Sequence, residues 1–239
     1  MAGQVTVHLH NAAAGQEEAL HRAFETSHLS SLAHVPQLRR AQRFARAQDQ
    51  LLREIAQPWG YVSVYEFESP RPAIDVPALA PALADLRDAG LIAQDGTERI
   101  FSYDMYSDWK YGPEFRPGPF THMMLLLANF TPGREAEYHQ WYDDQHSVEV
   151  TNSPGYVAMK RGRLSPAQVP PFNYCPGDQL ILAGIQTQDM DGALTEFRKR
   201  ALGGCAPEVA WGPRSTAASI ARTVHIFESV QGPFEPGAT

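Results

Sequence analysis

Histidines are the side chains of this sequence best suited to acid–base chemistry, and there are nine of them. His139, Tyr142, His146 and Glu149 follow one another at intervals of three, four and three residues, which places them on one face of a helix. An imidazole at the edge of an apolar cavity can titrate near neutral pH, so His146 is a candidate general base or acid. Tyr142 is placed to hydrogen-bond a substrate oxygen, and Asp143, three residues before His146, to orient the imidazole.

A structural role explains the same histidines. A helical histidine that faces a sheet can hydrogen-bond a buried carbonyl without taking part in catalysis. Glu135 lies four residues before His139, as Glu17 does before His21, and a Glu–His pair on an exposed helix face accounts for both. The spacing alone therefore leaves catalysis and structure open as roles.

The segment that carries these residues occurs twice, at a constant offset of 118 residues and without a gap. The offset pairs Gly15 with Gly133, Glu17 with Glu135, His21 with His139, His28 with His146, Pro36 with Pro154, and Arg43 with Arg161. Two copies of one supersecondary unit indicate a duplicated architecture. His28 thereby becomes a second candidate acid or base, and Phe24 occupies the position that corresponds to Tyr142.

His8 and His10 form a further candidate set, because residues two apart on a strand point to the same face. Their counterparts in the second half are Leu126 and Ala128, so the two copies differ here. A duplicated protein often keeps its site in one half while the other half becomes scaffold. The alternative interpretation is that both histidines lie on a partly hydrated sheet face.

Each half of the chain predicts the order strand, helix, strand, strand, helix, strand. In the first half, hydrophobic periodicity and turn residues predict these elements at 4–10, 15–33, 38–47, 61–68, 78–89 and 99–105. In the second half they predict them at 123–130, 134–151, 156–164, 180–186, 191–201 and 222–228. A connector rich in proline, glycine and aromatic residues spans 108–120. We expect two repeats, 1–115 and 116–239.

This βαββαβ order is typical of the ferredoxin-like unit, in which helices cover one face of a four-stranded antiparallel sheet. The other face of the sheet stays uncovered unless a second sheet packs on it. We therefore expect an α+β protein in which two ferredoxin-like repeats form one intramolecular α+β barrel of two antiparallel sheets with outer helices. Trp109 and Tyr111, in the connector, are candidates to line the mouth of a pocket for a flat ligand.

Composition narrows the classes of function. A net charge of -7 argues against a nucleic-acid surface, and the apolar run at 123–128 is far shorter than the ~20 residues that span a bilayer. Cys175 and Cys205 do not form a disulfide framework, and the first ten residues do not resemble a secretory signal, so we expect a cytoplasmic protein. A small-molecule substrate is the expected partner, with a homodimer left open. No spacing of histidine, cysteine and acidic residues predicts a metal site.

Residues 130–164, FTPGREAEYHQWYDDQHSVEVTNSPGYVAMKRGRL, resemble the EthD-like branch of the dimeric α+β barrel superfamily. The resemblance rests on a helix reading W-Y-x-x-x-H, followed by a Pro-Gly turn and a strand that ends in basic residues. The matching residues are Trp141, Tyr142, His146, Pro154, Gly155 and Arg161, of which the first half keeps the equivalents His28, Pro36 and Arg43. Members of this superfamily include polyketide cyclases, lactone isomerases, dehydratases, quinol-forming monooxygenases and haem enzymes.

The resemblance and the residues together favour a cofactor-independent lyase or isomerase that acts on a small, hydrophobic, aromatic or oxygenated metabolite. In this hypothesis His146 or His28 is the acid or base, Tyr142 polarises an oxygen and Asp143 orients the imidazole. The substrate-binding candidates are His8, His10, Phe24, Trp141, His139, Trp109 and Tyr111. Two alternatives stay open: a haem- or redox-dependent oxidoreductase, and a non-catalytic protein that binds a small ligand or responds to stress.

Overall fold

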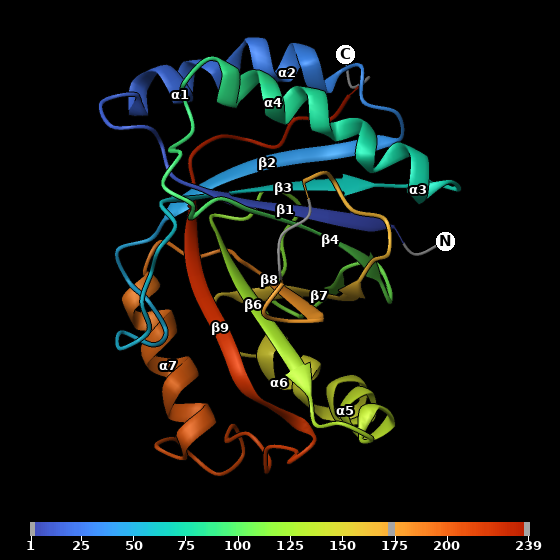
Figure 1. Cartoon of the computed structure of the whole chain (residues 1–239). Helices are drawn as coiled ribbons and strands as arrows, with labels where there is room; N and C mark the ends of the chain where they lie inside the picture. The colour runs from blue at the N-terminus through green and yellow to red at the C-terminus, as the bar shows by residue number, and fades with distance from the viewer. Residues whose placement is uncertain (1–2, 172–174, 237–239) are drawn as a thin grey trace.

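The computed structural model describes residues 3–171 and 175–236, which form one closed β-barrel with helices on its outside (Figure 1). The strand order is β4-β1-β3-β2-β9-β6-β8-β7-β5, and a further pairing between β4 and β7 closes the sheet. Eight of these strands form the antiparallel barrel, to which the short β5 is added as a neighbour of β7. The α+β barrel class expected from the sequence is therefore present.

The first half of the chain supplies four strands in the order β4-β1-β3-β2. Their bounds are β1 (Gln4–His10), β2 (Leu38–Arg46), β3 (Tyr61–Phe67) and β4 (Arg99–Met105). The helical elements are α1 (Glu17–Glu25), α2 (Ser27–Leu32), α3 (Pro72–Asp75), the 3-10 turn η1 (Pro77–Leu79) and α4 (Ala80–Asp88). Figure 1 shows α1, α2 and α4 lying together over one face of this sheet.

The second half supplies its strands in the corresponding order, β9-β6-β8-β7. The strands are β5 (Lys110–Tyr111), β6 (His122–Phe130), β7 (Tyr156–Leu164), β8 (Gln179–Ile185) and β9 (Ala218–Ser229). The helices are α5 (Glu135–Trp141), the π-helical turn η2 (Tyr142–His146), α6 (Ser147–Thr151) and α7 (Met190–Leu202). The bounds of β7 and β8 lie 118 residues after those of β2 and β3, so the offset seen in the sequence is also the offset between these strands.

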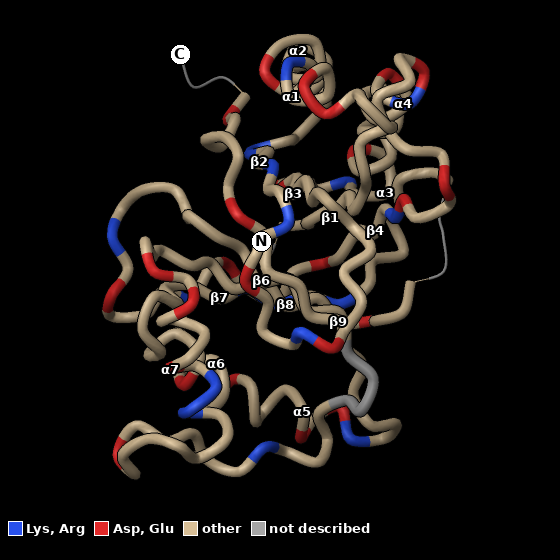
Figure 2. Tube along the Cα trace, turned by 90° about the vertical axis from the view of Figure 1, so that its left-hand side faces the viewer, with Lys and Arg blue, Asp and Glu red and all other residues tan. Residues whose placement is uncertain are grey.

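Antiparallel pairing of β2 with β9 and of β4 with β7 joins the two halves. Inside the barrel, apolar residues of both halves form one core, which includes Val5, Val7 and Leu9 of β1 and Leu125 and Leu127 of β6. The division into repeats at 115 and 116 stays a prediction. Charged residues of both signs are interspersed along both halves (Figure 2).

Strand alternation decides which side chains of β1 point into the barrel and which point outward, towards the helices. Because successive residues point to opposite faces, the core position of Val7 and Leu9 places His8 and His10 on the face under the helices. All seven residues of β1 are buried. The expectation of a partly hydrated face is therefore wrong for these two histidines, because α1, α2 and α4 cover it.

The long helix expected at 15–33 is interrupted, and the one expected at 134–151 contains a π-helical turn. At Thr26 the backbone leaves the helical region (φ -132°, ψ -91°) and separates α1 from α2. The hydroxyl of Thr26 donates to the carbonyl of Arg22 at 2.6 Å, a local bond that competes with the helix. In the second half the helix continues from 135 to 151 through the π-helical turn Tyr142–His146. Among the described residues, no helix has both the length and the apolar character needed to cross a membrane.

Candidate active site

Three buried histidines lie next to one another between the first sheet and its helices. His8 and His10 are fully buried, and His28 of α2 is 2 % exposed. The ring centroids of His8 and His10 are 4.4 Å apart, and the ring of Phe24 lies 5.9 Å from His10 and 4.5 Å from His28. We call His8, His10 and His28 the histidine cluster.

Glu98, just before β4, fixes the hydrogen bonding of His8. Its Oε1 lies 2.6 Å from Nε2 of His8, while Nε of Arg87 donates to both carboxylate oxygens at 2.9 and 3.0 Å. Burial opposes ionisation of Glu98, but the hydrogen bonds from His8 and Arg87 bring its pKa down to about 2. An ionised carboxylate only accepts hydrogen bonds, so Nε2 of His8 carries the hydrogen and Nδ1 keeps its lone pair. Among the described residues, this buried Nδ1 has no partner.

The other two imidazoles are neutral at pH 7. Burial lowers the pKa of His10 well below its usual range, and it lowers the pKa of His28 to about 3. Nε2 of His28 lies 3.1 Å from the hydroxyl of Tyr65, whose pKa burial raises. Neither ring nitrogen of His10 has a partner in the part of the chain that the structure describes. A neutral imidazole offers one donor and one acceptor, so His10 can receive a ligand's polar group.

Arg43 of β2 lies beside the histidine cluster and is fully buried. Its guanidinium carbon is 4.6 Å from the ring centroid of Phe24 and 4.1 Å from that of Tyr61. Nη1 donates to Nδ1 of His21 at 3.1 Å. Burial lowers the pKa of Arg43 to about 10, so the side chain stays positively charged at neutral pH.

A cavity of about 350 Å³ opens next to this group of residues. Asn11, Ala12, Glu17, Ala45, Arg46, Gly60 and Tyr61 line it. The ring of Tyr61 also lies edge-on to His10 and His21, at centroid distances of 5.6 and 5.8 Å. Tyr61 therefore both lines the cavity and contacts the buried groups.

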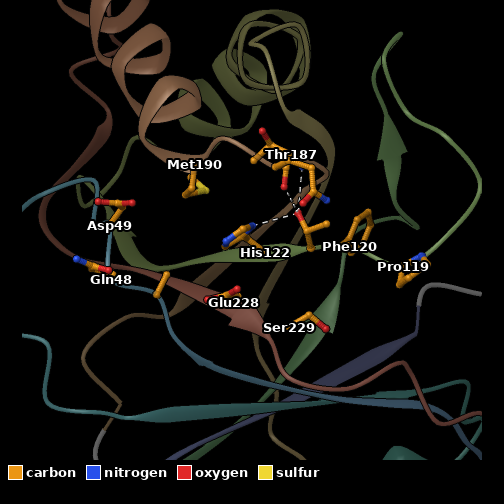
Figure 3. A pocket seen from close by; sticks show the side chains of 12 residues that line it. Gln48, Asp49, Pro119, Phe120, His122, Thr187, Met190, Glu228 and Ser229 are labelled. Atoms are coloured by element: carbon orange, nitrogen blue, oxygen red, sulfur yellow. Dashed lines mark hydrogen bonds between the residues drawn. The ribbon is translucent and has the colours of Figure 1, made fainter.

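A larger cavity of about 540 Å³ lies elsewhere, between the start of β6 and the end of β9 (Figure 3). Its one histidine, His122, contacts the hydroxyl of Thr121 through Nδ1 at 3.1 Å, and Glu228 projects from the neighbouring strand. Neither a second imidazole nor an arginine occurs among its lining residues. The smaller cavity is therefore the better candidate, because several acid–base groups and a buried cation lie next to it.

The chain is similar to known proteins in its fold and not in its sequence. No protein-family model matches the chain, and no curated protein matches it in sequence. Among solved structures, an anthrone oxidase-like protein is similar over 99 % of this chain and 94 % of its own, with a TM-score of 0.61 at 10 % identity. A candidate monooxygenase from Lactobacillus acidophilus is similar over 100 % and 99 % (TM-score 0.59, 9 % identity), and a candidate chlorite dismutase over 97 % and 96 % (TM-score 0.51, 13 % identity).

This chain has the dimeric α+β barrel fold. At 9–13 % identity, the likeness concerns the fold alone. In this barrel both sheets come from one chain, and the helix-covered face of the first sheet holds the histidine cluster.

The equivalent place in the second half of the barrel is largely apolar. Ile181, Ala183 and Met124 belong to its core, and Leu126 and Ala128 stand where β1 has His8 and His10. His146 stacks on Trp141 at 4.3 Å, with 11° between the ring planes, and lies edge-on to Trp211 at 5.1 Å. The second half therefore surrounds its histidine with indole rings instead of further imidazoles.

The expected role of Asp143 is wrong. Its Oδ1 accepts from Nη2 of Arg161 at 2.6 Å and from Nζ of Lys110 at 2.9 Å, because two cations attract this carboxylate away from the imidazole. Glu149 contacts His146 instead, with 3.2 Å between Oε2 and Nδ1. Tyr142 is buried against His146 and under the guanidinium of Arg161, at 5.1 and 4.5 Å.

The remaining candidates lie away from the histidine cluster. His139 packs against Tyr106 at 4.7 Å, and its Nε2 is 3.6 Å from Glu135, as the Glu–His interpretation predicted. Trp109 packs on Phe120 at 5.0 Å beside the barrel core, and Tyr111 is exposed. The structure brings neither connector residue to the small cavity, since β5 pairs this segment with β7.

Sequence reasoning missed Tyr61, Tyr65, Arg87 and Glu98. Tyr61 and Tyr65 are four residues apart on one strand, so the same alternation that pairs His8 with His10 places both on one face of β3. For Glu98 no local signal exists, because it precedes β4 in a loop and meets His8 across 90 residues of chain.

Haem does not fit the histidine cluster as it is packed. An axial histidine needs a flat, open slot on the side of its ligating nitrogen. The ring centroids of His8, Tyr61 and Phe24 lie 4.4, 5.6 and 5.9 Å from that of His10, so three rings already pack against this imidazole. Within 3–171 and 175–236, no group of three or more histidine, cysteine or acidic residues is arranged to hold a metal ion.

Proposed function

We propose that this chain is an enzyme that removes a proton from a small oxygenated, flat substrate at the histidine cluster, with Nδ1 of His8 as the base. The observation that carries the proposal is the Arg87–Glu98–His8 chain, which leaves one buried imidazole nitrogen with a lone pair and with no partner among the described residues. A carboxylate behind an imidazole also stabilises the imidazolium that forms when the proton arrives.

Tyr65, next to the histidine cluster, would stabilise the charge that proton removal leaves on the substrate. When a C–H bond beside a carbonyl is broken, its electron pair moves onto the carbonyl oxygen and forms an enolate. Tyr65, kept protonated by burial and in contact with His28, is an O–H donor for the substrate. Return of the proton at another carbon completes an isomerisation, and loss of a leaving group completes an elimination. This chemistry needs no cofactor and agrees with the lyase or isomerase hypothesis.

We also infer that the chain is a tandem pair of ferredoxin-like repeats of the EthD-like branch. Support comes from the equal strand orders of the two halves and from the 118-residue offset between β2 and β7. The Trp141, Tyr142 and His146 motif supports the branch. Because only the first repeat holds the three histidines, we place the reaction there.

A second candidate function uses the same proton transfer and then dioxygen. The similar folds of an anthrone oxidase-like protein and a candidate monooxygenase favour it. In such a reaction a deprotonated CH2 group reacts with O2 to give C=O and one molecule of water, so that O2 accepts four electrons. The histidine cluster would again remove the proton.

One experiment separates these functions. Anthrone, whose CH2 hydrogens are acidic, is incubated with the protein in deuterated buffer without oxygen, and deuterium uptake is followed by NMR. We expect uptake faster than in buffer, and a fall of about 100-fold or more in the His8→Gln variant. Full uptake by that variant would remove His8 as the base. His139→Gln is the matched control.

Admitting oxygen then distinguishes the two outcomes. Oxygen consumption with formation of anthraquinone favours the dioxygen-dependent reaction, whereas exchange without oxygen consumption favours the lyase or isomerase. Binding of anthrone without any exchange would instead favour a non-catalytic binding protein. A visible absorption band of the purified protein would return haem to consideration.

A further inference from the structure

Arg43 carries a buried positive charge that forms no ion pair with an acidic side chain among the described residues. The residue is fully buried, yet Nε and Nη2 have no hydrogen-bond partner, and no carboxylate forms an ion pair with it in the described ranges 3–171 and 175–236. Nη1 donates to His21. Buried arginines are normally paired, because removing an isolated charge from water is costly.

The free atoms of Arg43 form a defined binding edge. Nε–H and one N–H of Nη2 lie side by side on the guanidinium plane and together match the two oxygens of a carboxylate. Phe24 and Tyr61 hold the guanidinium in place through their rings, at 4.6 and 4.1 Å. The donors are thus oriented before any ligand binds.

In the second half of the chain, the equivalent arginine also packs on an aromatic ring, and there it binds a carboxylate of the chain itself. Arg161 lies 118 residues after Arg43, and Tyr142 packs on its guanidinium as Phe24 packs on that of Arg43. Nη2 of Arg161, however, donates to Asp143 at 2.6 Å. The position equivalent to Asp143 is Glu25, which is exposed at the end of α1 and forms no ion pair with Arg43. One copy therefore has a carboxylate in contact with its arginine, and the other does not.

We propose that Arg43 binds the carboxylate of the substrate, which makes that substrate a small organic monoanion with a flat, aromatic body. This inference rests on the proposed function, since it defines the substrate class of the same site. The aromatic neighbours of the guanidinium, Tyr61 and Phe24, also touch His10, so a ligand held on Arg43 lies next to the histidine cluster. Its anionic group would take the place that Asp143 takes in the second half.

Binding of three naphthalene probes that share one ring system and carry an anionic, a neutral and a cationic substituent tests the inference. Titration calorimetry compares 2-naphthoate, the neutral 2-naphthamide and the cationic 2-naphthylmethylamine. We expect the wild-type chain to bind 2-naphthoate roughly tenfold or more tightly than the amide, and the amine least. Arg43→Met abolishes this preference, and Arg43→Lys keeps part of it because a point charge replaces the two-donor edge. Arg161→Met is the matched control and keeps the preference.

A measurement on the unaltered protein covers the case in which Arg43→Met does not fold. The Nε–H NMR signal of Arg43 is expected to move on addition of 2-naphthoate and to stay in place with the amide. Equal binding of all three probes, or a preference that survives Arg43→Met, would overturn the inference. Carboxylate preference together with proton exchange that survives in His8→Gln would leave the inference standing and remove the proposed function. Exchange that depends on His8 without any carboxylate preference would do the opposite.

Discussion

Nε2 of His8 and Oε1 of Glu98 lie 2.6 Å apart, although 90 residues separate them in the chain. This contact sets the tautomer of a fully buried imidazole and leaves its Nδ1 without a hydrogen. The contact joins β1 to the loop residue that precedes β4. Arg87 of α4, in the helix layer, donates to the same carboxylate.

The tautomer of His8 can be measured directly. Nitrogen-15 NMR of the imidazole is expected to show a hydrogen on Nε2 and a bare Nδ1 in the wild-type chain at pH 7. In Glu98→Gln this preference falls, because an amide can also donate to Nε2. Glu68→Gln, at an exposed residue that pairs only with Arg39, serves as the control and leaves the spectrum of His8 unchanged. An identical His8 spectrum in Glu98→Gln would contradict the assignment.

Tyr61 is expected to control access to the buried imidazoles. Tyr61 lines the cavity of about 350 Å³ and its ring packs edge-on to His10, so replacement by alanine should connect them. Diethylpyrocarbonate, which acylates accessible neutral histidines, should modify His10 in Tyr61→Ala at least several-fold faster than in the wild-type chain, as read by mass spectrometry. Tyr111→Ala changes an exposed ring and should have no such effect. Equal modification rates at His10 would show that access does not depend on Tyr61.

The shared barrel core predicts a large stability effect at Phe44. This side chain is fully buried in the cluster that both halves build. Phe44→Ala should lower the free energy of unfolding by about 3–5 kcal/mol, through lost burial and a residual cavity. Leu202→Ala, at a residue 84 % exposed, should change it by less than ~0.5 kcal/mol. Urea unfolding of both variants measures the difference, and similar midpoints would argue against one common core.

His28 is expected to make the fold sensitive to acid. Burial lowers its pKa from 6.5 to about 3, so the unfolded chain takes up a proton at a higher pH than the folded chain does. Stability therefore falls as the pH drops below 6.5, by up to about 1.4 kcal/mol per pH unit from this one group, and levels off below about pH 3. In His28→Gln this contribution is absent.

Urea unfolding of both proteins at pH 7, 6, 5 and 4 provides the measurement. The difference in unfolding free energy between wild type and His28→Gln should shift in favour of the variant at each step below pH 6. Glu98 and the other histidines remain in both proteins, so their contributions largely cancel. Parallel pH curves would mean that His28 is already protonated in the folded chain or is exposed to water.

Much of the fold follows from local patterns. The alternation of β1 predicted that His8 and His10 share a face, and the repeat predicted that His28 and His146 occupy equivalent positions. The prediction of an unbroken helix was wrong at Thr26, where a hydrogen bond within one turn, which periodicity does not record, competes with the helix. In the second half the helix continues from 135 to 151 through a π-helical turn at Tyr142–His146.

Local sequence patterns could not predict which side chains pair when the two residues lie far apart in the chain. The sequence predicted that Asp143 would orient His146, since the two are close on one helix, but the charge of Arg161 on β7 attracts the carboxylate more strongly. Glu98, in a loop, gave no periodic signal at all. Side-chain pairing of this kind depends on which strands meet and on how much water is excluded around them.

The sequence by itself determined the duplicated strand–helix order and the face on which each histidine of a strand lies, because backbone geometry makes both properties periodic. Only the tertiary structure decided that the sheet closes into one barrel through β4 and β7, and that Glu98 meets His8. It also decided that Arg161 forms an ion pair with a carboxylate, whereas Arg43 forms none with the residues that the structure describes. Those outcomes depend on contacts between distant segments, whose strength depends on burial and charge rather than on spacing along the chain.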